Sequence, residues 1–263
     1  MTIELENKDL TPQERESIEF LLNSQNPQIH DDLEQIWYLM NKVWDEMGCD
    51  NKNIDWDKLG KYYSHPVWLL NGLFIENHDI SIQVRENIAD YIAKKDFQTI
   101  VDYGGGFGTL AKAIAKKSPD KQIFIYEPFP SEYGKRCVAN YPNIDFISKL
   151  ESEFDCIIAT DVLEHLEDPL ESFEEMLGYL KINGEAIIGN CFYPCIKCHL
   201  PQNFHYRYSF DSFAKFMGLK NLGILKNTYA TIFLKTKNQK LNPTIKTMGG
   251  GDKQNNISHY LFT

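Results

Sequence analysis

The chain has 263 residues, of which 43% are hydrophobic and 24% charged, and its formal net charge is −10 at pH 7. This composition excludes a disordered chain and predicts a sizeable globular core. A broad phosphate-binding surface needs the opposite charge, so nucleic acid is not expected as a partner. The first ten residues do not resemble a secretory signal, and no apolar run is long enough to predict a membrane span. We therefore expect a cytoplasmic protein whose six cysteines stay reduced.

Residues 1–95 predict a helical extension. Helices are expected over residues 9–23, 27–47 and 81–94, and the second has apolar residues, tryptophans included, at helical spacing. The extension is expected to act as a lid over the site that the rest of the chain forms. Four of its residues are candidates for substrate contact, although domain packing is the favoured interpretation: Tyr62, Tyr63, His65 and Trp68.

From residue 96 to 237, short apolar strands alternate with helices. Strands are expected at 98–103, 122–127, 144–147, 154–161 and 181–190, with two more near 223–226 and 230–235. Helices are expected after the glycines at 104–108 and over 130–140, 169–180 and 209–217. This alternation predicts an α/β fold with a mostly parallel sheet covered by helices on both faces. The polar residues 238–263 are expected to form a C-terminal tail.

The segment V-D-Y-G-G-G-F-G places Asp102 directly before a turn of glycines, which let a ligand lie against the backbone. The dinucleotide spacing G-x-G-x-x-G fails here, at Phe107 or Thr109. A carboxylate before the turn suits an ammonium group better than a pyrophosphate. Glu127 ends the next strand, 19 residues after Gly108 (127 − 108), where a carboxylate can accept both hydroxyls of a ribose. A ribose near an ammonium group describes S-adenosyl-L-methionine.

The chain resembles the class I S-adenosylmethionine-dependent methyltransferases in four ordered blocks: V-D-Y-G-G-G-F-G-T-L-A, I-Y-E-P, F-D-C-I-I-A-T-D-V-L-E-H-L-E-D-P and L-K-I-N-G-E-A-I-I-G-N. The third block resembles a subgroup that includes quinone and other small-molecule methyltransferases. The resemblance implies a Rossmann-like seven-stranded sheet whose last strand is antiparallel. It also implies cofactor contacts from the glycine turn, the ribose carboxylate, the adenine neighbours and the end of the fourth strand: Asp102, Gly104, Gly106, Glu127, Pro128, Phe129, Asp161 and Val162. Many relatives bind the adenine amine with an acid after the third strand, and this chain has F-I-S-K-L there instead.

The same resemblance places His165 at the mouth of the fourth strand, where acceptors bind in this fold. A histidine can take the proton of a hydroxyl during in-line methyl transfer, so His165 is a candidate general base. The alternative is that Glu164 and His165 orient the following helix. H-Y-R-Y-S-F resembles an element of the same subgroup, and it indicates substrate contact by Tyr206 and Arg207 and a catalytic or substrate role for His205. The alternative for Arg207 is an ion pair with a structural acid.

A cysteine-rich segment follows the fifth predicted strand and contains Cys191, Cys195, Cys198 and His199, with His205 shortly after them. Its C-x-x-C-H has the spacing that attaches c-type haem, and the set could also bind zinc. The missing export signal argues against haem, and structural zinc commonly uses two separated ligand pairs. We favour thiols and a histidine that line a pocket loop, and zinc at this loop stays open. No metal is expected to be required for catalysis.

These features predict a methyltransferase that acts on a small-molecule acceptor. A hydroxyl of a sugar or sugar nucleotide, in polysaccharide biosynthesis, is the first expectation. A quinone or phenol acceptor, N-methylation of a small amine and a non-catalytic interaction module of the same fold are the alternatives. The N/D-P-P-Y motif of enzymes that methylate bases is absent after the fourth strand. Whether the protein forms a homodimer stays open.

Overall fold

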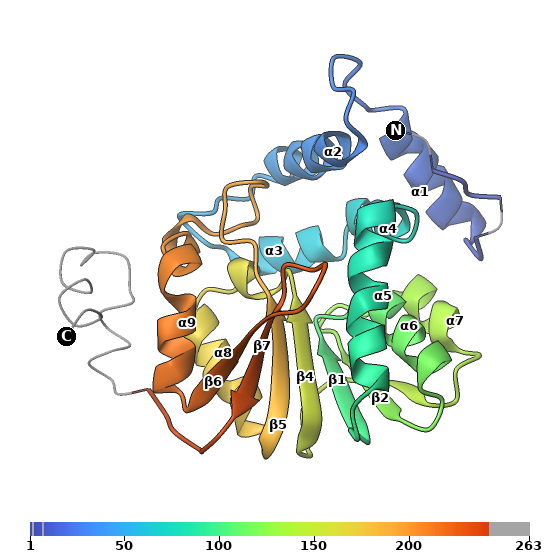
Figure 1. Ribbon diagram of the computed structural model, residues 1–263. Helices are drawn as coiled ribbons and strands as arrows, with labels where there is room; N and C mark the ends of the chain where they lie inside the picture. The colour runs from blue at the N-terminus through green and yellow to red at the C-terminus, as the bar shows by residue number, and fades with distance from the viewer. Residues whose placement is uncertain (2, 7, 242–263) are drawn as a thin grey trace.

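One seven-stranded sheet organises the chain, as the computed structural model shows for residues 1, 3–6 and 8–241 (Figure 1). The strand order is β3-β2-β1-β4-β5-β7-β6. Neighbours from β3 to β5 pair in parallel, and β7 is antiparallel to both β5 and β6. The predicted mostly parallel sheet with an antiparallel last strand is therefore confirmed. The strands are β1 (Thr99–Tyr103), β2 (Gln122–Tyr126), β3 (Ile144–Ile147), β4 (Phe154–Thr160), β5 (Leu180–Gly189), β6 (Leu219–Ile224) and β7 (Thr231–Lys235).

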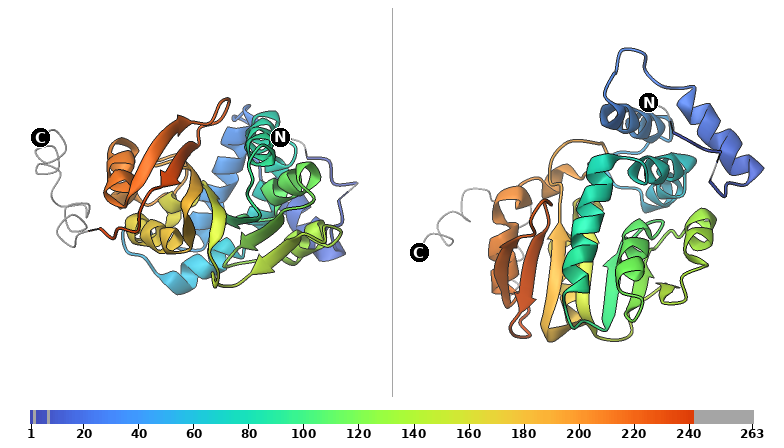
Figure 2. Two further views of the ribbon diagram at one scale, coloured as in Figure 1. Left: turned by 60° about the horizontal axis from the view of Figure 1, so that its bottom comes forward. Right: turned by 45° about the vertical axis from the view of Figure 1, so that its right-hand side comes forward.

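Helices cover both faces of the sheet (Figure 2). Because side chains alternate along a strand, Ile100 and Ile158 face one layer of helices, and Val101 and Ile157 face the other. The first layer is α5 (Asp79–Ala93), α6 (Thr109–Lys117) and α7 (Glu132–Val138), and the second is α8 (Pro169–Gly178) and α9 (Tyr206–Phe216). The helix α5 was predicted as part of the N-terminal extension, but it packs on α6 and the sheet.

Several boundaries differ from those predicted, and the cause is local. The helix α1 begins at Pro12, not at residue 9, because Thr11 and Glu14 form a capping box there. The helix α2 begins at Asp32, not at residue 27, because the Asp31 side chain caps it. The strand β6 begins at Leu219, four residues before its predicted start, and its pairing register with β7 shifts before Gly223. That irregularity breaks the alternation by which a strand is recognised in sequence.

The first four helices form a cap above the carboxyl edge of the sheet (Figures 1 and 2). They are α1 (Pro12–Leu22), α2 (Asp32–Glu46), α3 (Trp56–Tyr63) and α4 (Pro66–Ile75). Trp44 and Tyr62 are buried in their shared core, with ring centroids 5.1 Å apart in an edge-to-face arrangement. The packing interpretation of these aromatic residues is confirmed. Ile196 and Cys198, from the segment after β5, belong to the same core, so that segment is anchored to the cap.

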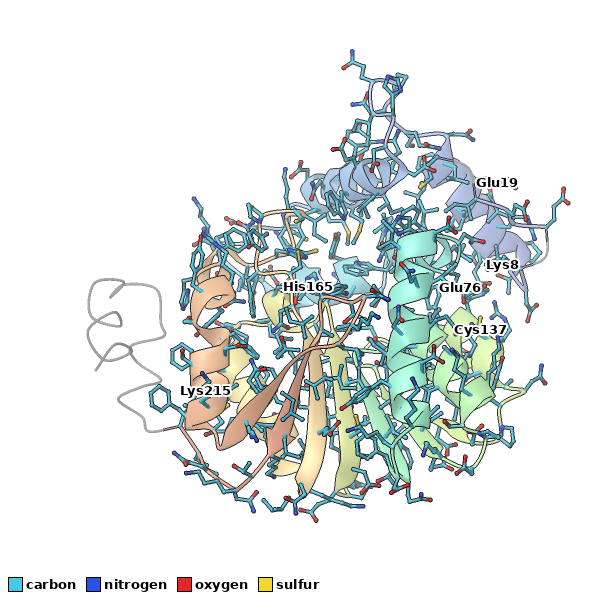
Figure 3. All side chains as sticks on the ribbon, viewed as in Figure 1. Lys8, Glu19, Glu76, Cys137, His165 and Lys215 are labelled. Carbon is cyan, nitrogen blue, oxygen red and sulfur yellow. The ribbon has the colours of Figure 1, made fainter. Side chains whose placement is uncertain are left out.

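A largely buried carboxylate joins the cap to the helix layer on the sheet. Glu76, at the end of α4, lies beside Lys8 (Figure 3) and accepts hydrogen bonds of 2.8 Å from Lys8 Nζ and from Lys112 Nζ on α6. Burial favours the neutral acid, but the two ammonium groups outweigh it and hold the pKa of Glu76 below its ordinary value. These two ion pairs link the end of α4 to α6 and to the N-terminal segment.

Two other expectations concerned membrane-spanning helices and the C-terminal tail. Within the described part of the chain, no helix combines the length and the apolar character that crossing a bilayer requires. The predicted polar tail is described only up to Leu241, whose side chain is buried in the core beneath α8 and α9. The rest of that prediction, residues 242–263, lies outside the described residues.

Candidate active site

The glycine turn after β1 is shaped by three residues in the left-handed region. Gly104, Gly106 and Gly108 have φ values of +72°, +54° and +71°, which glycine adopts without the strain of a side chain. A Cβ at Gly104 would lie 2.6 Å from Val162 Cγ2, whereas a Cβ at Gly106 would meet nothing within 4 Å. The turn is therefore packed against β4 on one side and open at Gly106, where a ligand can approach the backbone.

Asp102 is the buried acid beneath this turn. Its side chain is in the core at 2% exposure, and its Oδ2 has no hydrogen-bond partner among the residues described. Burial raises the pKa of Asp102 to about 7; the Arg85 charge opposes the shift and Glu127 adds to it. An unpartnered buried carboxylate oxygen is costly, so it indicates a missing cationic or hydrogen-bonding partner.

Glu127 follows β2 and faces the same turn. Its Oε2 accepts a hydrogen bond from the Gly106 amide, and its Oε1 accepts one from the Phe129 amide, both at 3.1 Å. Burial raises the pKa of Glu127, although these two amide donors oppose the shift. Each carboxylate oxygen keeps a further lone pair for a hydroxyl. Tyr63 of the cap stacks on the Phe129 ring at 5.8 Å, so the cap reaches the predicted adenine position beside Pro128.

The end of β4 forms the floor between the glycine turn and β5. Asp161 has a φ of +56° and is exposed, and its Oδ2 accepts a 2.5 Å hydrogen bond from the Tyr229 hydroxyl. Tyr229 lies between β6 and β7, far from Asp161 in the sequence. Sequence reasoning missed it, since a single tyrosine in a hairpin carries no pattern. At the end of β5, Asn190 Oδ1 is buried without a hydrogen-bond partner among the residues described.

His165 ends the short helix η1 (Leu163–His165), and Figure 3 shows it at the carboxyl edge of the sheet, beneath the cap. Three rings surround it: Trp68 at 6.0 Å, Tyr63 at 6.1 Å and His199 at 4.8 Å between centroids. His165 Nδ1 lies 3.2 Å from the Cys198 carbonyl oxygen. Because a carbonyl only accepts, Nδ1 carries the proton and Nε2 carries the lone pair. Burial lowers the pKa of His165 to about 3, with a smaller contribution from His199, so the ring is neutral at pH 7.

Two further buried polar groups lie in the same region. Glu164 is fully buried; its Oε1 accepts a 2.8 Å hydrogen bond from the Cys191 amide, and its Oε2 has no partner among the described residues. Burial and the nearby Asp161 raise the pKa of Glu164 to about 8. Trp68 Nε1 is a buried hydrogen-bond donor that likewise has no partner among the described residues. The sequence had suggested only helix orientation for Glu164, because its burial is a property of the folded chain.

The remaining predicted site residues, His205, Tyr206 and Arg207, come from a segment further along the chain than His165. They lie at the start of α9, after the short helix η2 (Pro201–Asn203). Tyr206 is buried against Phe192 in the core of the sheet, and the His205 ring packs on Tyr206. Arg207 is exposed, donates to the Phe204 carbonyl and lies over the Tyr208 ring at 4.5 Å. No acid forms an ion pair with Arg207 within the described residues.

Comparison with known protein families identifies the kind of domain that this site belongs to. A family model described as a methyltransferase domain matches residues 77–217, which are 141 of the 263 residues (217 − 77 + 1). The chain belongs to this methyltransferase family. The recognition of a class I S-adenosylmethionine-dependent methyltransferase is confirmed at the level of family and fold, while its finer subgroup is not. The match includes α5 and ends after α9, so it covers every residue of the edge except Tyr229 and the cap.

Individual relatives are distant. The ubiquinone biosynthesis O-methyltransferase of Saccharophagus degradans is 25% identical over 150 residues, 53% of this chain and 63% of that protein. The chain thus matches less than two thirds of the length of this curated relative. A structure of the plantazolicin methyltransferase BpumL, in complex with a pentazolic desmethylPZN analog and SAH, has a TM-score of 0.50 at 14% identity and covers 80% of this chain and 100% of that one. The mitomycin 7-O-methyltransferase MmcR also has a TM-score of 0.50 at 14% identity, over 76% of this chain and 66% of that one. These structures show the shared fold.

Proposed function

We propose that the protein transfers the methyl group of S-adenosyl-L-methionine to a hydroxyl of a small, ring-shaped molecule. The observation that carries the proposal is a set of buried polar atoms at the carboxyl edge of the sheet that have no hydrogen-bond partner within the described part of the chain. They are Asp102 Oδ2, Asn190 Oδ1 and Trp68 Nε1. Buried polar atoms are normally paired, and this edge is where ligands bind in open α/β sheets.

The residues at the glycine turn fit the cofactor. The unpartnered Asp102 oxygen suits the ammonium of the methionine part, and the open side of Gly106 lets the ligand lie against the backbone. Glu127 retains lone pairs for the two ribose hydroxyls. Phe129 offers a ring face beside Pro128 for the adenine, and Val162, next to Asp161 in the chain, packs against Gly104 on the other side of the turn. The bound cofactor would supply an electrophilic methyl group at this edge.

His165 is the proposed general base. Its Nε2 lone pair is fixed by the hydrogen bond between Nδ1 and the Cys198 carbonyl, and its neutral ring can take the proton of an acceptor hydroxyl. A ligand oxygen of Glu164 lies within 4.8 Å of a ring nitrogen of His165. The rings of Tyr63 and Trp68 give flat apolar walls that suit a sugar or phenol ring. The curated relative acts in ubiquinone biosynthesis, which supports the phenol, whereas a sugar or sugar nucleotide was the first expectation. Exposed Arg207 would bind an acidic group of such an acceptor, with His205 and Tyr206 behind it.

Calorimetric titration with S-adenosylhomocysteine tests the cofactor site. We expect binding to the wild type and at least tenfold weaker binding to Glu127→Ala, since a hydrogen bond to a charged group contributes about 1.5–3 kcal/mol. The exposed Glu132→Ala, at the start of the helix α7 that follows Glu127, is the matched control and should bind like the wild type. A folded wild-type protein that does not bind this ligand would contradict the proposal.

Transfer of a labelled methyl group to a panel of sugars, sugar nucleotides and phenols then identifies the acceptor. With the best acceptor, His165→Ala should lower kcat by about 10²- to 10⁴-fold while cofactor affinity is unchanged. His78→Ala, at the start of α5, is the control and should keep its kcat. If His165→Ala retains full turnover, His165 is not the base, and N-methylation of an amine, which needs no strong base, becomes the better assignment.

A further inference from the structure

The cysteine-rich segment after β5 brings three ligand-type side chains together in the folded chain. The ligand atoms of Cys191, Cys195 and His199 all lie within 4.8 Å of one another. Cys198 is absent from this group; its sulfur is buried and receives a 3.8 Å hydrogen bond from the Tyr62 hydroxyl. The three residues of the C-x-x-C-H sequence therefore do not lie together in the folded chain, because Cys195 and His199 are in the cluster and Cys198 packs against Tyr62. The residues that do lie together, Cys191, Cys195 and His199, have the spacing C-x3-C-x3-H.

The distance between the two sulfurs fits a shared metal ion. Cys191 Sγ and Cys195 Sγ are 3.6 Å apart, and both thiols are free. Two thiolates on one tetrahedral zinc ion, each about 2.3 Å from the metal, lie about 3.8 Å apart. A disulfide needs about 2.05 Å, so the observed separation is close to the first arrangement and far from the second.

The histidine is oriented as a metal ligand. His199 Nδ1 lies 2.7 Å from the Tyr193 carbonyl oxygen and so must donate to it, which leaves the Nε2 lone pair free to coordinate. This contact from the non-coordinating nitrogen to a carbonyl is the usual support of a metal-binding histidine. The ring is 5% exposed, so the orientation is held by the surrounding protein.

A buried carboxylate stands beside this cluster. Glu164 accepts the amide hydrogen bond of Cys191, and its ligand oxygen lies within 4.8 Å of ligand nitrogens on His199 and His165. Its Oε2 has no partner among the described residues. A water on the open fourth position of a metal ion could donate a hydrogen bond to this oxygen. This is a second, independent sign that a ligand is missing here.

We propose that Cys191, Cys195 and His199 bind one zinc ion, with water in the fourth position. Two thiolates and one imidazole suit zinc better than calcium or magnesium, which prefer oxygen ligands. The inference does not depend on the proposed methyl transfer. Its structural effect would be to hold the segment that carries the Cys198 carbonyl, the acceptor of the His165 Nδ1 hydrogen bond. A zinc ion here would thus hold the wall of the proposed acceptor pocket in place.

Elemental analysis of the reduced protein, purified without a metal-affinity tag and without chelator, is the first test. We expect about one zinc per chain in the wild type and in the control Cys137→Ser, which lies outside the cluster. Cys191→Ser and Cys195→Ser should each lose most of the zinc. Zinc that persists in both of these variants, or a wild type that contains none and takes up none when it is added, overturns the proposal.

Cobalt(II) added to metal-free wild-type protein gives a readout that does not depend on the folding of a variant. Thiolate-to-cobalt charge-transfer absorption together with intense tetrahedral ligand-field bands is the expected spectrum, and one equivalent of zinc should abolish it. A weak octahedral spectrum shows that the thiolates do not bind and refutes the site. Mass spectrometry gives one more test on protein prepared in the presence of reductant. A Cys191–Cys195 disulfide that forms even then, seen as a mass two units below that of the chain with free thiols, refutes the site as well.

Discussion

Asp102→Asn tests whether burial keeps the acid beneath the glycine turn protonated in the ligand-free protein. Burial shifts the pKa of Asp102 from 3.8 to about 7. A shift of about three units corresponds to about 4 kcal/mol at 1.36 kcal/mol per unit. Because the pKa is raised in the folded state, this stability is fully present below about pH 4 and is lost as the pH rises through about 7.

The assay is urea unfolding of both proteins at pH 5 and pH 8. From pH 5 to pH 8 the wild type should lose about 3 kcal/mol more unfolding free energy than Asp102→Asn, which cannot ionise. Asp120→Asn removes an exposed carboxylate and should follow the wild type. If Asp102→Asn and the wild type lose equal stability over this range, Asp102 is not held protonated by burial, and the electrostatic argument for the site is wrong.

The same titration links stability to ligand binding. An ammonium group beside Asp102 favours the ionised form, so S-adenosylhomocysteine affinity of the wild type should rise by up to about a hundredfold between pH 5 and pH 7. In Asp102→Asn the affinity should be weak and nearly independent of pH over that interval. If the affinity of the wild type is equally independent of pH, the ammonium group of the ligand does not lie beside Asp102.

Two further predictions concern the frame of the site. Gly104→Ala combines a φ of +72° with a Cβ 2.6 Å from Val162 Cγ2, so it should lower the free energy of unfolding by about 1–3 kcal/mol. Gly178→Ala, where a Cβ meets nothing within 4 Å, should be neutral or mildly stabilising in the same urea titration, and equal losses would contradict the steric argument. Glu76→Gln leaves the ammonium groups of Lys8 and Lys112 without a counter-charge and should cost about 2 kcal/mol at pH 7, against no change for the exposed Glu132→Gln. Because the folded pKa of Glu76 is depressed, this difference should disappear as the pH falls through it, and a difference that persists in acid would refute the ion-pair explanation.

Much of the cofactor side could be predicted because it depends on short-range patterns. Asp102, the three glycines and the acid at Glu127 lie at fixed offsets from two consecutive parallel strands, and such strands end at one edge. The structure places them together, with the Gly106 amide bonded to Glu127. Their contacts with a bound cofactor stay a prediction.

The proposed acceptor side was harder to predict because its members come from distant segments. Trp68 from the cap, His165 after β4 and His199 after β5 come together only when the sheet and the cap pack, and Tyr229 before β7 reaches Asp161 in the same way. Nothing in their local sequence states which atoms become buried without a partner. The cysteine segment shows the same limit, because its C-x-x-C-H spacing did not indicate that Cys191 and Cys195 approach His199 while Cys198 lies elsewhere.

The sequence by itself determined the alternation of strands and helices, the two helix layers and the glycine turn, since these follow from periodicity and backbone freedom within a few residues. Only the tertiary structure decided that α5 joins the sheet layer, that Glu164 is buried beside His165, and that Cys191 and Cys195 approach His199 while Cys198 turns to Tyr62. The physical reason is that burial and side-chain proximity are properties of packing between segments far apart in the chain. A periodic pattern specifies which face of an element is apolar and leaves open which neighbour will cover it.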